Sequence, residues 1–336
     1  MTSSFDPVRA VLERPEALRT LLEPKGPITL GNARWQPLAQ FYPATAPRAS
    51  YRVRAGTGDY FVKLNIRSAS VQREAHMLQL LEQAQMRRFL VPSVVDVRVN
   101  VPIVDELSGS WIAMPWAEGS SLRASDQATW SDAAAGLLAN LHALPIDYEA
   151  IQRWYGILPP APAELAQKAH ALRRQHLREA IAQTQAPLSD RLAEIDAAWR
   201  PLSFGSLSLV HGDFHLDNLL RCAAAIRPES LMLLDWEDGT LDTPLSDVAH
   251  LAVHHVLLKD QPLPVGFIHH YWRAALLERR PATLPELYSD LALLAASWVA
   301  RALRHAPLPL PGPARLFQEK AMSTLAILLD EEKWHE

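Results

Sequence analysis

A single cysteine, Cys222, is present among the 336 residues of the chain. One cysteine excludes an internal disulfide bond and is typical of proteins kept in a reducing compartment. No activating pattern surrounds it, so we interpret Cys222 as a small buried residue and not as a nucleophile. The first residues do not form a basic segment followed by an apolar core, so no signal peptide is predicted and a cytoplasmic location is expected.

Long apolar runs and a surplus of basic residues are also missing. The longest apolar stretch, 291–300, has 10 residues, whereas a membrane-spanning helix needs about 20, so no membrane partner is expected. The formal net charge is −4, which gives no basic surface for nucleic acid, and a nucleic-acid partner is therefore not expected. No feature of the sequence defines an oligomeric state.

The pattern of residues changes from strands to helices along the chain. A length of 336 residues suits about two domains. Strand-like segments separated by turns, with one helix, are predicted early in the chain, at 28–30, 51–53, 60–66 and, for the helix, 70–84. Helical periodicity is predicted elsewhere, at 6–23, 130–143, 163–185, 188–199, 265–279, 284–305 and from 314 onward. We predict an α+β protein with an antiparallel-sheet domain at 1–117 and a mainly helical domain at 118–336.

Two short apolar runs, 207–210 and 231–234, are each followed or ended by a carboxylate. Asp213 follows the first run, Asp235 directly follows the second, and Asn218 lies between them. Apolar runs of this length are typical of buried strands, which hold the polar groups at their ends rigidly. A carboxylate base, an amide oxygen and a second carboxylate are what metal-assisted phosphoryl transfer requires, with the last two holding magnesium.

Lys63 is the one charge in the mostly apolar strand predicted at 60–66. A buried ammonium needs a partner. Glu74 lies on the apolar stripe of the helix predicted at 70–84, so it faces inward and needs a cation in turn. We therefore predict that Lys63 pairs with Glu74.

The central motifs resemble those of the aminoglycoside phosphotransferase and choline kinase family, which are small-molecule kinases with a two-lobed, protein-kinase-like fold. The resemblance rests on His-Gly-Asp-Phe-His-Leu-Asp-Asn at 211–218 and on Leu-Leu-Asp-Trp-Glu at 233–237. It implies that Asp213 is the catalytic base and that Asn218 and Asp235 are the Mg²⁺ ligands. The expected reaction moves the γ-phosphate of ATP to a hydroxyl group of a small molecule.

The resemblance also implies a nucleotide site in the sheet domain. Lys63 would engage the phosphates of ATP, with GTP as an alternative nucleotide, and Glu74 would position the lysine. The segment 111–122 resembles the strand that runs into the hinge of such kinases. There, backbone groups bind adenine, so Met114, Trp116 and Ala117 would line the adenine pocket.

The loop that covers the phosphates in kinases corresponds to 42–53, and here the part before the strand contains no glycine. Glycine allows close backbone contact with phosphate, and the two prolines of this loop stiffen it further. Ser50 or Arg48 would have to supply phosphate contacts instead. This departure leaves open a nucleotide-binding pseudokinase that acts as an interaction module.

The acceptor is indicated only by charge. Four carboxylates lie close in sequence to the reacting groups, namely Asp217, Glu237, Asp238 and Asp242. Their concentration favours a cationic acceptor, such as an amino sugar or a choline-like amine, by electrostatic attraction. Neutral sugars, homoserine-like alcohols and macrolides stay open, because some of these carboxylates can brace the loop or be solvated.

Several histidines allow other interpretations. His142 lies on an apolar helix and is interpreted as a structural residue, and Asp247 matches a family position that braces the catalytic loop. His250 and His254 have the spacing of a helical metal pair, but the only third ligand that the sequence suggests is Asp247, so an ordinary helix surface is favoured.

A rival function uses the catalytic motif itself. The alternation His-x-Asp-x-His-x-Asp at 211–217, if it lies on a strand, would place all four side chains on one face. Such a cluster suits zinc or iron in a metal-dependent hydrolase. This interpretation leaves Asn218 and Asp235 without roles.

Overall fold

The computed structural model describes residues 33–41, 48–65, 68–83, 89–104, 107–122, 127–145, 162–184, 188–202, 207–222, 231–259, 263–275, 284–304, 320 and 323. The chain divides into two compact units, one comprising 1–120 with 220–239 and the other comprising 121–219 with 240–336. Asp235 therefore belongs to the first unit, whereas Asp213 and Asn218 belong to the second. The domain division predicted near residue 117 stays a prediction.

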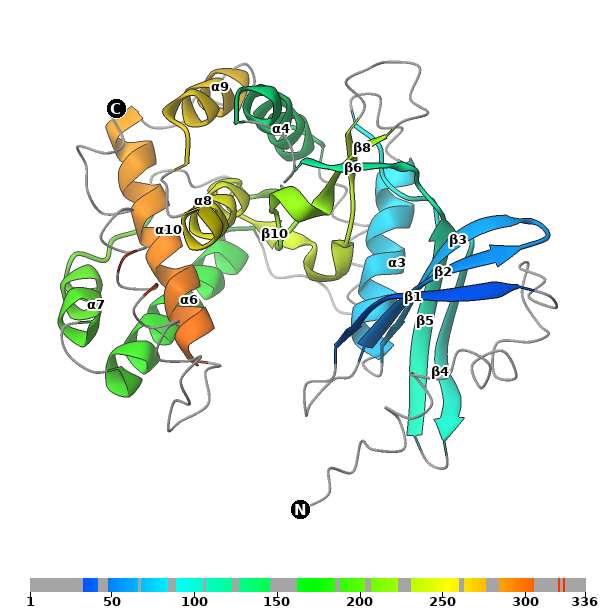
Figure 1. Cartoon of the computed structure of the whole chain (residues 1–336). Coiled ribbons are helices and arrows are strands. Elements are labelled where there is room, and N and C mark those ends of the chain that lie inside the picture. Colours follow the sequence, from blue (N-terminus) through cyan, green and yellow to red (C-terminus); the bar gives the residue numbers. More distant parts are fainter. Residues whose placement is uncertain are drawn as a thin grey trace. The chain divides into compact units, whose positions relative to one another are not determined.

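The first unit is built on a five-stranded antiparallel sheet with the strand order β1-β2-β3-β5-β4 (Figure 1). Its strands are β1 (Arg34–Phe41), β2 (Arg48–Ala55), β3 (Gly58–Asn65), β4 (Asp96–Val104) and β5 (Leu107–Pro115). The tight turn between β2 and β3 needs a glycine, because Gly58 has a φ of 143°.

Strand β3 leads from the surface into the core. Its first residues are exposed or half-buried and its last four, from Val62, are buried. Lys63 lies within this buried end, opposite Ser50 of β2 on one side and Ile112 of β5 on the other. The position of β3 between β2 and β5 therefore fixes the backbone from which the Lys63 side chain extends.

Helix α3 (Ser68–Gln83) packs against β3, β4 and β5. The buried residues of one face recur at helical spacing, at Val71, Ala75, Leu78 and Leu81. Glu74 lies on this inner side and is 1% exposed. The sheet therefore buries both members of the predicted lysine–glutamate pair.

The segment that carries Asp235 is held against α3. Strands β6 (Gly119–Ser121), β8 (Leu219–Cys222) and β9 (Leu231–Leu233) form a small sheet in the order β6-β8-β9, and a 3-10 helix follows at Trp236–Asp238. This 3-10 helix packs on α3. A Cβ atom added at Gly239 would lie 2.9 Å from the side chain of Met77, so glycine permits the close approach.

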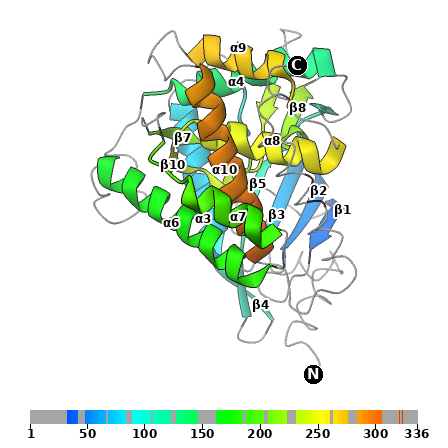
Figure 2. The same ribbon diagram turned by 90° about the vertical axis from the view of Figure 1, so that its left-hand side faces the viewer.

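The second unit is mainly helical (Figures 1 and 2). Its helices are α4 (Gln127–His142), α6 (Pro162–Gln183), α7 (Leu188–Ala197), α8 (Leu245–Lys259), α9 (Val265–Ala275) and α10 (Leu284–Arg304). Helix α4 packs on α9, whereas α10 packs on α6 and α8. Strands β7 (Ser208–Val210) and β10 (Thr240–Asp242) pair antiparallel. The motif at 211–218 directly follows β7 in the chain.

The predicted α+β class is confirmed, with an antiparallel sheet in one unit and helices in the other. The sequence did not predict β1 or β4. Strand β1 is an edge strand with exposed residues such as Leu38 and a register irregularity after Pro37, so its hydrophobic alternation is weak. The predictions for 6–23, 28–30, the glycine-free loop at 42–47 and most of the last helix lie outside the described residues. Among the described residues, no helix is long and apolar enough to cross a membrane.

We predict that Leu81→Ala lowers the free energy of unfolding by about 2–5 kcal/mol, because the leucine is fully buried and its removal leaves a cavity. Urea unfolding followed by circular dichroism measures the change. The control is Gln79→Ala, an exposed position on the same helix, which should change the stability by less than about 0.5 kcal/mol. Equal effects of the two substitutions would contradict the packing of α3 on the sheet.

Candidate active site

The side chain of Lys63 lies among three carboxylates of the first unit. Its Nζ is 3.0 Å from Glu74 Oε2 and 2.5 Å from Asp235 Oδ1. Glu237 Oε2 is the third partner, at 2.9 Å. The structure thus brings together the lysine and glutamate predicted from separate patterns, joins Asp235 to them, and adds Glu237, whose role here the sequence did not indicate.

The cluster carries a surplus of negative charge. Burial alone would lower the pKa of Lys63, but the three carboxylates outweigh it and raise the pKa well above its usual value, so the lysine is charged. Burial raises the pKa of Glu74, an effect that the ammonium of Lys63 opposes. The side chain of Asp235 is 34% exposed, so the charge of the cluster is open to solvent there. Carboxylate oxygens are the ligands that Mg²⁺ prefers, and Asp235 with Glu237 therefore fits this ion.

The backbone of Asp235 has an unusual conformation. Its φ is 63° and its ψ is 66°, which is the left-handed region that residues other than glycine seldom adopt. The indole Nε1 of Trp236 donates to the carbonyl of Leu233 at 2.9 Å. This hydrogen bond joins the residues before and after the turn and so stabilises it. Such conformations persist only where the surroundings impose them, and they concentrate at functional sites.

The second unit contains the motif at 211–218, which begins in a loop that follows β7. Asp213 lies in this loop, and Asn218 ends the 3-10 helix Leu216–Asn218. The amide nitrogen of Asn218 donates to the backbone oxygen of Asp213 at 2.9 Å. This bond uses the amide nitrogen of Asn218, which leaves its carbonyl oxygen as the atom suited to a metal ion.

Asp247, at the start of α8, holds this loop through hydrogen bonds. Its carboxylate is fully buried and accepts hydrogen bonds from the backbone nitrogens of His211 and Gly212, at 2.8 and 2.9 Å. His142 Nε2 lies 3.1 Å from the same carboxylate, and His142 Nδ1 lies 2.8 Å from the hydroxyl of Tyr271. Both the bracing role of Asp247 and the structural role of His142 are confirmed by these contacts.

Asp213 itself is held in its ionised form. Burial would raise its pKa, but a hydrogen bond from His215 and the nearby imidazole of His250 keep the pKa well below its usual range. Burial lowers the pKa of His250 to about 3, so this imidazole is neutral at ordinary pH. A carboxylate with a low pKa is a weak base that orients a hydroxyl group more than it deprotonates it.

Comparison with known proteins identifies the family. A family model described as "Phosphotransferase enzyme family" matches residues 41–287. The chain belongs to this family. The predicted resemblance to aminoglycoside phosphotransferases and choline kinases is thereby confirmed.

Solved structures support the fold of this phosphotransferase. The macrolide 2'-phosphotransferase from Brachybacterium faecium is 21% identical with a TM-score of 0.58, over 94% of this chain and 97% of that one. The Plasmodium vivax ethanolamine kinase is 13% identical with a TM-score of 0.55, over 90% of this chain and 83% of that one. These likenesses confirm the protein-kinase-like fold.

Curated relatives match a much shorter segment of the phosphotransferase. Acyl-CoA dehydrogenase family member 10 of Mus musculus is 38% identical over 84 residues, which are 24% of this chain and 7% of that protein. Family member 11 of Homo sapiens is 32% identical over 85 residues, which are 25% of this chain and 11% of that protein. The match thus spans about a tenth of these longer relatives.

The residues predicted for the adenine pocket lie at the end of β5 and just beyond it. Met114 is buried in the sheet opposite Phe61. The backbone nitrogen of Trp116 donates to the carbonyl of Asp59 at 2.8 Å, and its ring lies 4.3 Å from the guanidinium of Arg52. Because this N–H is already bonded within the sheet, a contact of Trp116 with adenine would have to use another group.

Two of the four carboxylates that suggested a cationic acceptor have basic partners. Glu237 pairs with Lys63, as described above. Asp242 pairs with Arg173 of α6 and also accepts a hydrogen bond from the backbone nitrogen of Thr243. The electrostatic argument for a cationic acceptor is correspondingly weaker.

The strand assumed for the rival hydrolase interpretation is absent from the motif. Strand β7 ends at Val210, residues 211–215 form a loop, and 216–218 form a 3-10 helix. The alternation of side chains on one face is therefore wrong for 211–217. The hydrogen bonds that Asp247 accepts from the loop backbone explain this, because they turn the chain away from the extended form.

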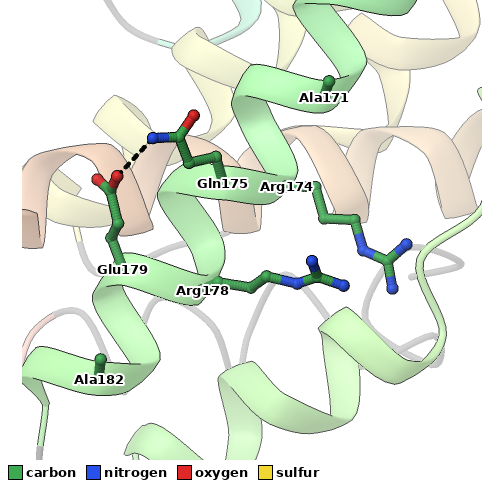
Figure 3. A pocket seen from close by; sticks show the side chains of 6 residues that line it. All are labelled: Ala171, Arg174, Gln175, Arg178, Glu179 and Ala182. Carbon is green, nitrogen blue, oxygen red and sulfur yellow. Dashed lines mark hydrogen bonds between the residues drawn. The ribbon is translucent and has the colours of Figure 1, made fainter.

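A hollow on helix α6 is lined by residues other than those discussed above. Figure 3 shows the six residues that line it, which are Ala171, Arg174, Gln175, Arg178, Glu179 and Ala182. The two guanidinium groups point to the same side of the helix, where both pair with the carboxylate of Asp196. These arginines connect α6 to α7 and leave no cluster of unpaired basic groups in the hollow.

We predict that Asp247→Asn destabilises the phosphotransferase by about 2–4 kcal/mol at neutral pH, because it removes a buried charge that accepts several hydrogen bonds. Burial would raise the pKa of Asp247, but its hydrogen bonds with His142 and His211 lower it below the usual value. The stabilisation by the ionised group is therefore complete above about pH 4, the unfolded value, and is lost as the pH falls through the lower folded value.

Urea unfolding across this pH range checks both parts of that prediction. The difference in unfolding free energy between the wild type and Asp247→Asn should narrow below about pH 4. Asp132→Asn, an exposed carboxylate on α4, serves as the control and should show no such difference. A difference that stays constant into acid would mean that the charge of Asp247 does not stabilise the loop.

Proposed function

We propose that the protein is a kinase that transfers the γ-phosphate of ATP to a hydroxyl group of a small molecule. The observation that carries this proposal is the cluster of Lys63 with Glu74, Asp235 and Glu237, formed from three separate stretches of the chain. A buried lysine held by a helix glutamate, beside a carboxylate suited to a metal ion, matches the nucleotide site of kinases. Family membership supports the same reaction.

In this proposal Lys63 binds the phosphates of the nucleotide. The carboxylate of Glu74 holds the ammonium in place, since both groups are buried and 3.0 Å apart. Ser50, which lies opposite Lys63 in the sheet, would add a phosphate contact. Met114, Trp116 and Ala117 would line the adenine pocket, and GTP stays an alternative nucleotide.

Asn218 and Asp235 are proposed to hold Mg²⁺ through their side-chain oxygens. When bound, the ion would neutralise charge on the phosphates. A hydrogen bond at Asn218 and the backbone conformation at Asp235 support this role. The amide nitrogen of Asn218 is used by Asp213, which orients its oxygen, and the left-handed backbone of Asp235 fixes its carboxylate.

Asp213 is proposed as the base that orients the acceptor hydroxyl and takes its proton. Its pKa is held low, so the carboxylate is ionised before the acceptor binds. In a loose transition state the proton leaves late, and correct orientation matters more than base strength. The loop geometry imposed by Asp247 is thus part of the catalytic arrangement.

The class of acceptor is proposed to be a small hydroxylated molecule. An amino sugar or a choline-like amine remains the cationic candidate, because acidic residues lie close in sequence to the proposed reacting groups. Known relatives of this fold include enzymes named for macrolide and ethanolamine substrates. The acceptor panel should therefore contain both cationic and neutral alcohols.

We predict Mg²⁺-dependent release of ADP that an acceptor stimulates and that Asp213→Ala reduces at least about 100-fold, because the oriented base is lost. The assay runs ATP against aminoglycosides, choline, ethanolamine, amino sugars, macrolides and neutral sugars. Asp132→Ala is the matched control, an exposed aspartate of the same unit, and should keep the wild-type rate.

Two outcomes would contradict the proposal. One is acceptor-stimulated release of ADP that persists unchanged in Asp213→Ala. The other is the absence of both ATP binding and ADP release with every acceptor of the panel. Tight ATP binding without turnover would instead support the pseudokinase.

A further inference from the structure

Three imidazole rings gather on one side of Asp213, and the proposed reaction uses none of them as a reacting group. His250 Nε2 lies 3.5 Å from Asp213 Oδ1, and His215 Nε2 lies 3.5 Å from Asp213 Oδ2. The ring of His254 stacks on that of His215, with centroids 4.5 Å apart, and meets His250 edge-on at 5.1 Å. All four residues belong to the second unit.

This cluster differs from the structural histidine of the same unit. Both ring nitrogens of His142 have partners, namely Asp247 and the hydroxyl of Tyr271. By contrast, Nδ1 of His215 and Nδ1 of His250 are buried without a hydrogen-bond partner among the described residues. His250 is 7% exposed, and its ring stacks on Trp298 at 4.4 Å, which fixes its orientation. The unpartnered nitrogen of His250 is Nδ1, whereas its Nε2 faces Asp213, and stacking on Trp298 holds the ring in that orientation.

We propose that Asp213, His250 and His254 form a binding site for a divalent transition metal ion of the zinc type. One donor atom of each lies within 4.8 Å of the donor atoms of the other two. Ligand atoms bound to zinc at 2.0–2.1 Å and at the tetrahedral angle lie about 3.3 Å apart. The 3.5 Å between Asp213 Oδ1 and His250 Nε2 is already close to this spacing.

The structure supplies the third ligand that the sequence did not. Sequence spacing pairs His250 with His254 on α8 and suggests Asp247 as their partner. Asp247 is instead directed to His142 and to the loop backbone. The loop that Asp247 holds carries Asp213 to the two histidines, a contact over 37 residues of sequence that no local pattern could show.

The donor set selects the metal. Two imidazole nitrogens and one carboxylate oxygen suit zinc and its neighbours in the transition series, whereas Mg²⁺ prefers oxygen ligands only. The site is thus distinct in chemistry from the magnesium ligands Asn218 and Asp235. Solvent reaches it through Asp213, whose side chain is 33% exposed. Three protein ligands leave a fourth position for water or for the ring of His215.

Occupation of this site would hold the carboxylate that orients the acceptor hydroxyl. Zinc should therefore inhibit phosphoryl transfer, and this consequence rests on the proposed function. Binding of the ion itself does not rest on it, because the three ligands belong to the second unit and need neither nucleotide nor acceptor. The two proposals consequently fail in different experiments.

The test is a Zn²⁺ titration of the whole chain without nucleotide or Mg²⁺, by chelator competition, with bound zinc counted by atomic emission. We expect one ion per chain, and we expect affinity to fall roughly tenfold or more in His254→Gln, which removes one ligand. His270→Gln is the matched control, since His270 is a half-exposed histidine on α9 and should leave the affinity unchanged. Thermal unfolding verifies that each variant is folded.

Co²⁺ gives a second readout that does not depend on a variant. A tetrahedral site should produce the intense visible absorption of four-coordinate Co²⁺, and Zn²⁺ should displace it in a 1:1 ratio. Failure to bind one Zn²⁺ per chain would overturn the proposal. So would equal affinities of the wild type and His254→Gln.

Discussion

The ammonium of Lys63, surrounded by three carboxylates, is the interaction on which the first unit depends. A buried charge is unfavourable unless it is paired, so the sheet, helix α3 and the segment around Asp235 must meet at one point. Their packing supplies Glu74 from the helix and Asp235 from a strained turn. The surplus of negative charge that remains is suited to a divalent metal ion. The packing that buries Lys63 therefore also forms the proposed nucleotide site.

A second buried charge organises the other unit. Asp247 binds two backbone nitrogens of the catalytic loop and the imidazole of His142, and so determines where Asp213 lies. Lys63 and Asp247 differ in one respect. The Lys63 cluster is open to solvent at Asp235, as a binding site must be, whereas Asp247 is closed on all sides and serves only to hold the loop.

The sequence predicted the buried charges at positions where the chemistry of the residue and the periodicity of its strand or helix agree. Lys63 in an apolar strand and Glu74 on an apolar helix face each require a buried partner, and that requirement predicts their contact. Asp247 and His142 follow from the family motif and from their place on apolar helices. Strand β4 was not predicted, although its apolar and polar residues alternate as in a strand. Strand β1 has little such alternation, because it is an exposed edge strand that contains Pro37.

What could not be predicted depends on contacts between distant segments. In the sequence, Glu237 cannot be told from any other acidic residue near the motif. Its pairing with Lys63 depends on the turn at Asp235, which directs its side chain to the lysine. Asp213 meets His250 of α8 only when the loop is in place, a contact that joins segments 37 residues apart. The assumption of a strand at 211–217 fails for the same reason, since the backbone hydrogen bonds to Asp247 are not visible in a local pattern.

In the proposed function, Asp235 completes a magnesium-dependent nucleotide site around Lys63. Calorimetric titration with a non-hydrolysable ATP analogue, with and without Mg²⁺, tests it most directly in the wild type and in Asp235→Asn. We expect Mg²⁺ to strengthen nucleotide binding in the wild type, and we expect this gain to be largely lost in the variant, while Mg²⁺-free binding persists. An equal gain from Mg²⁺ in both proteins would contradict it.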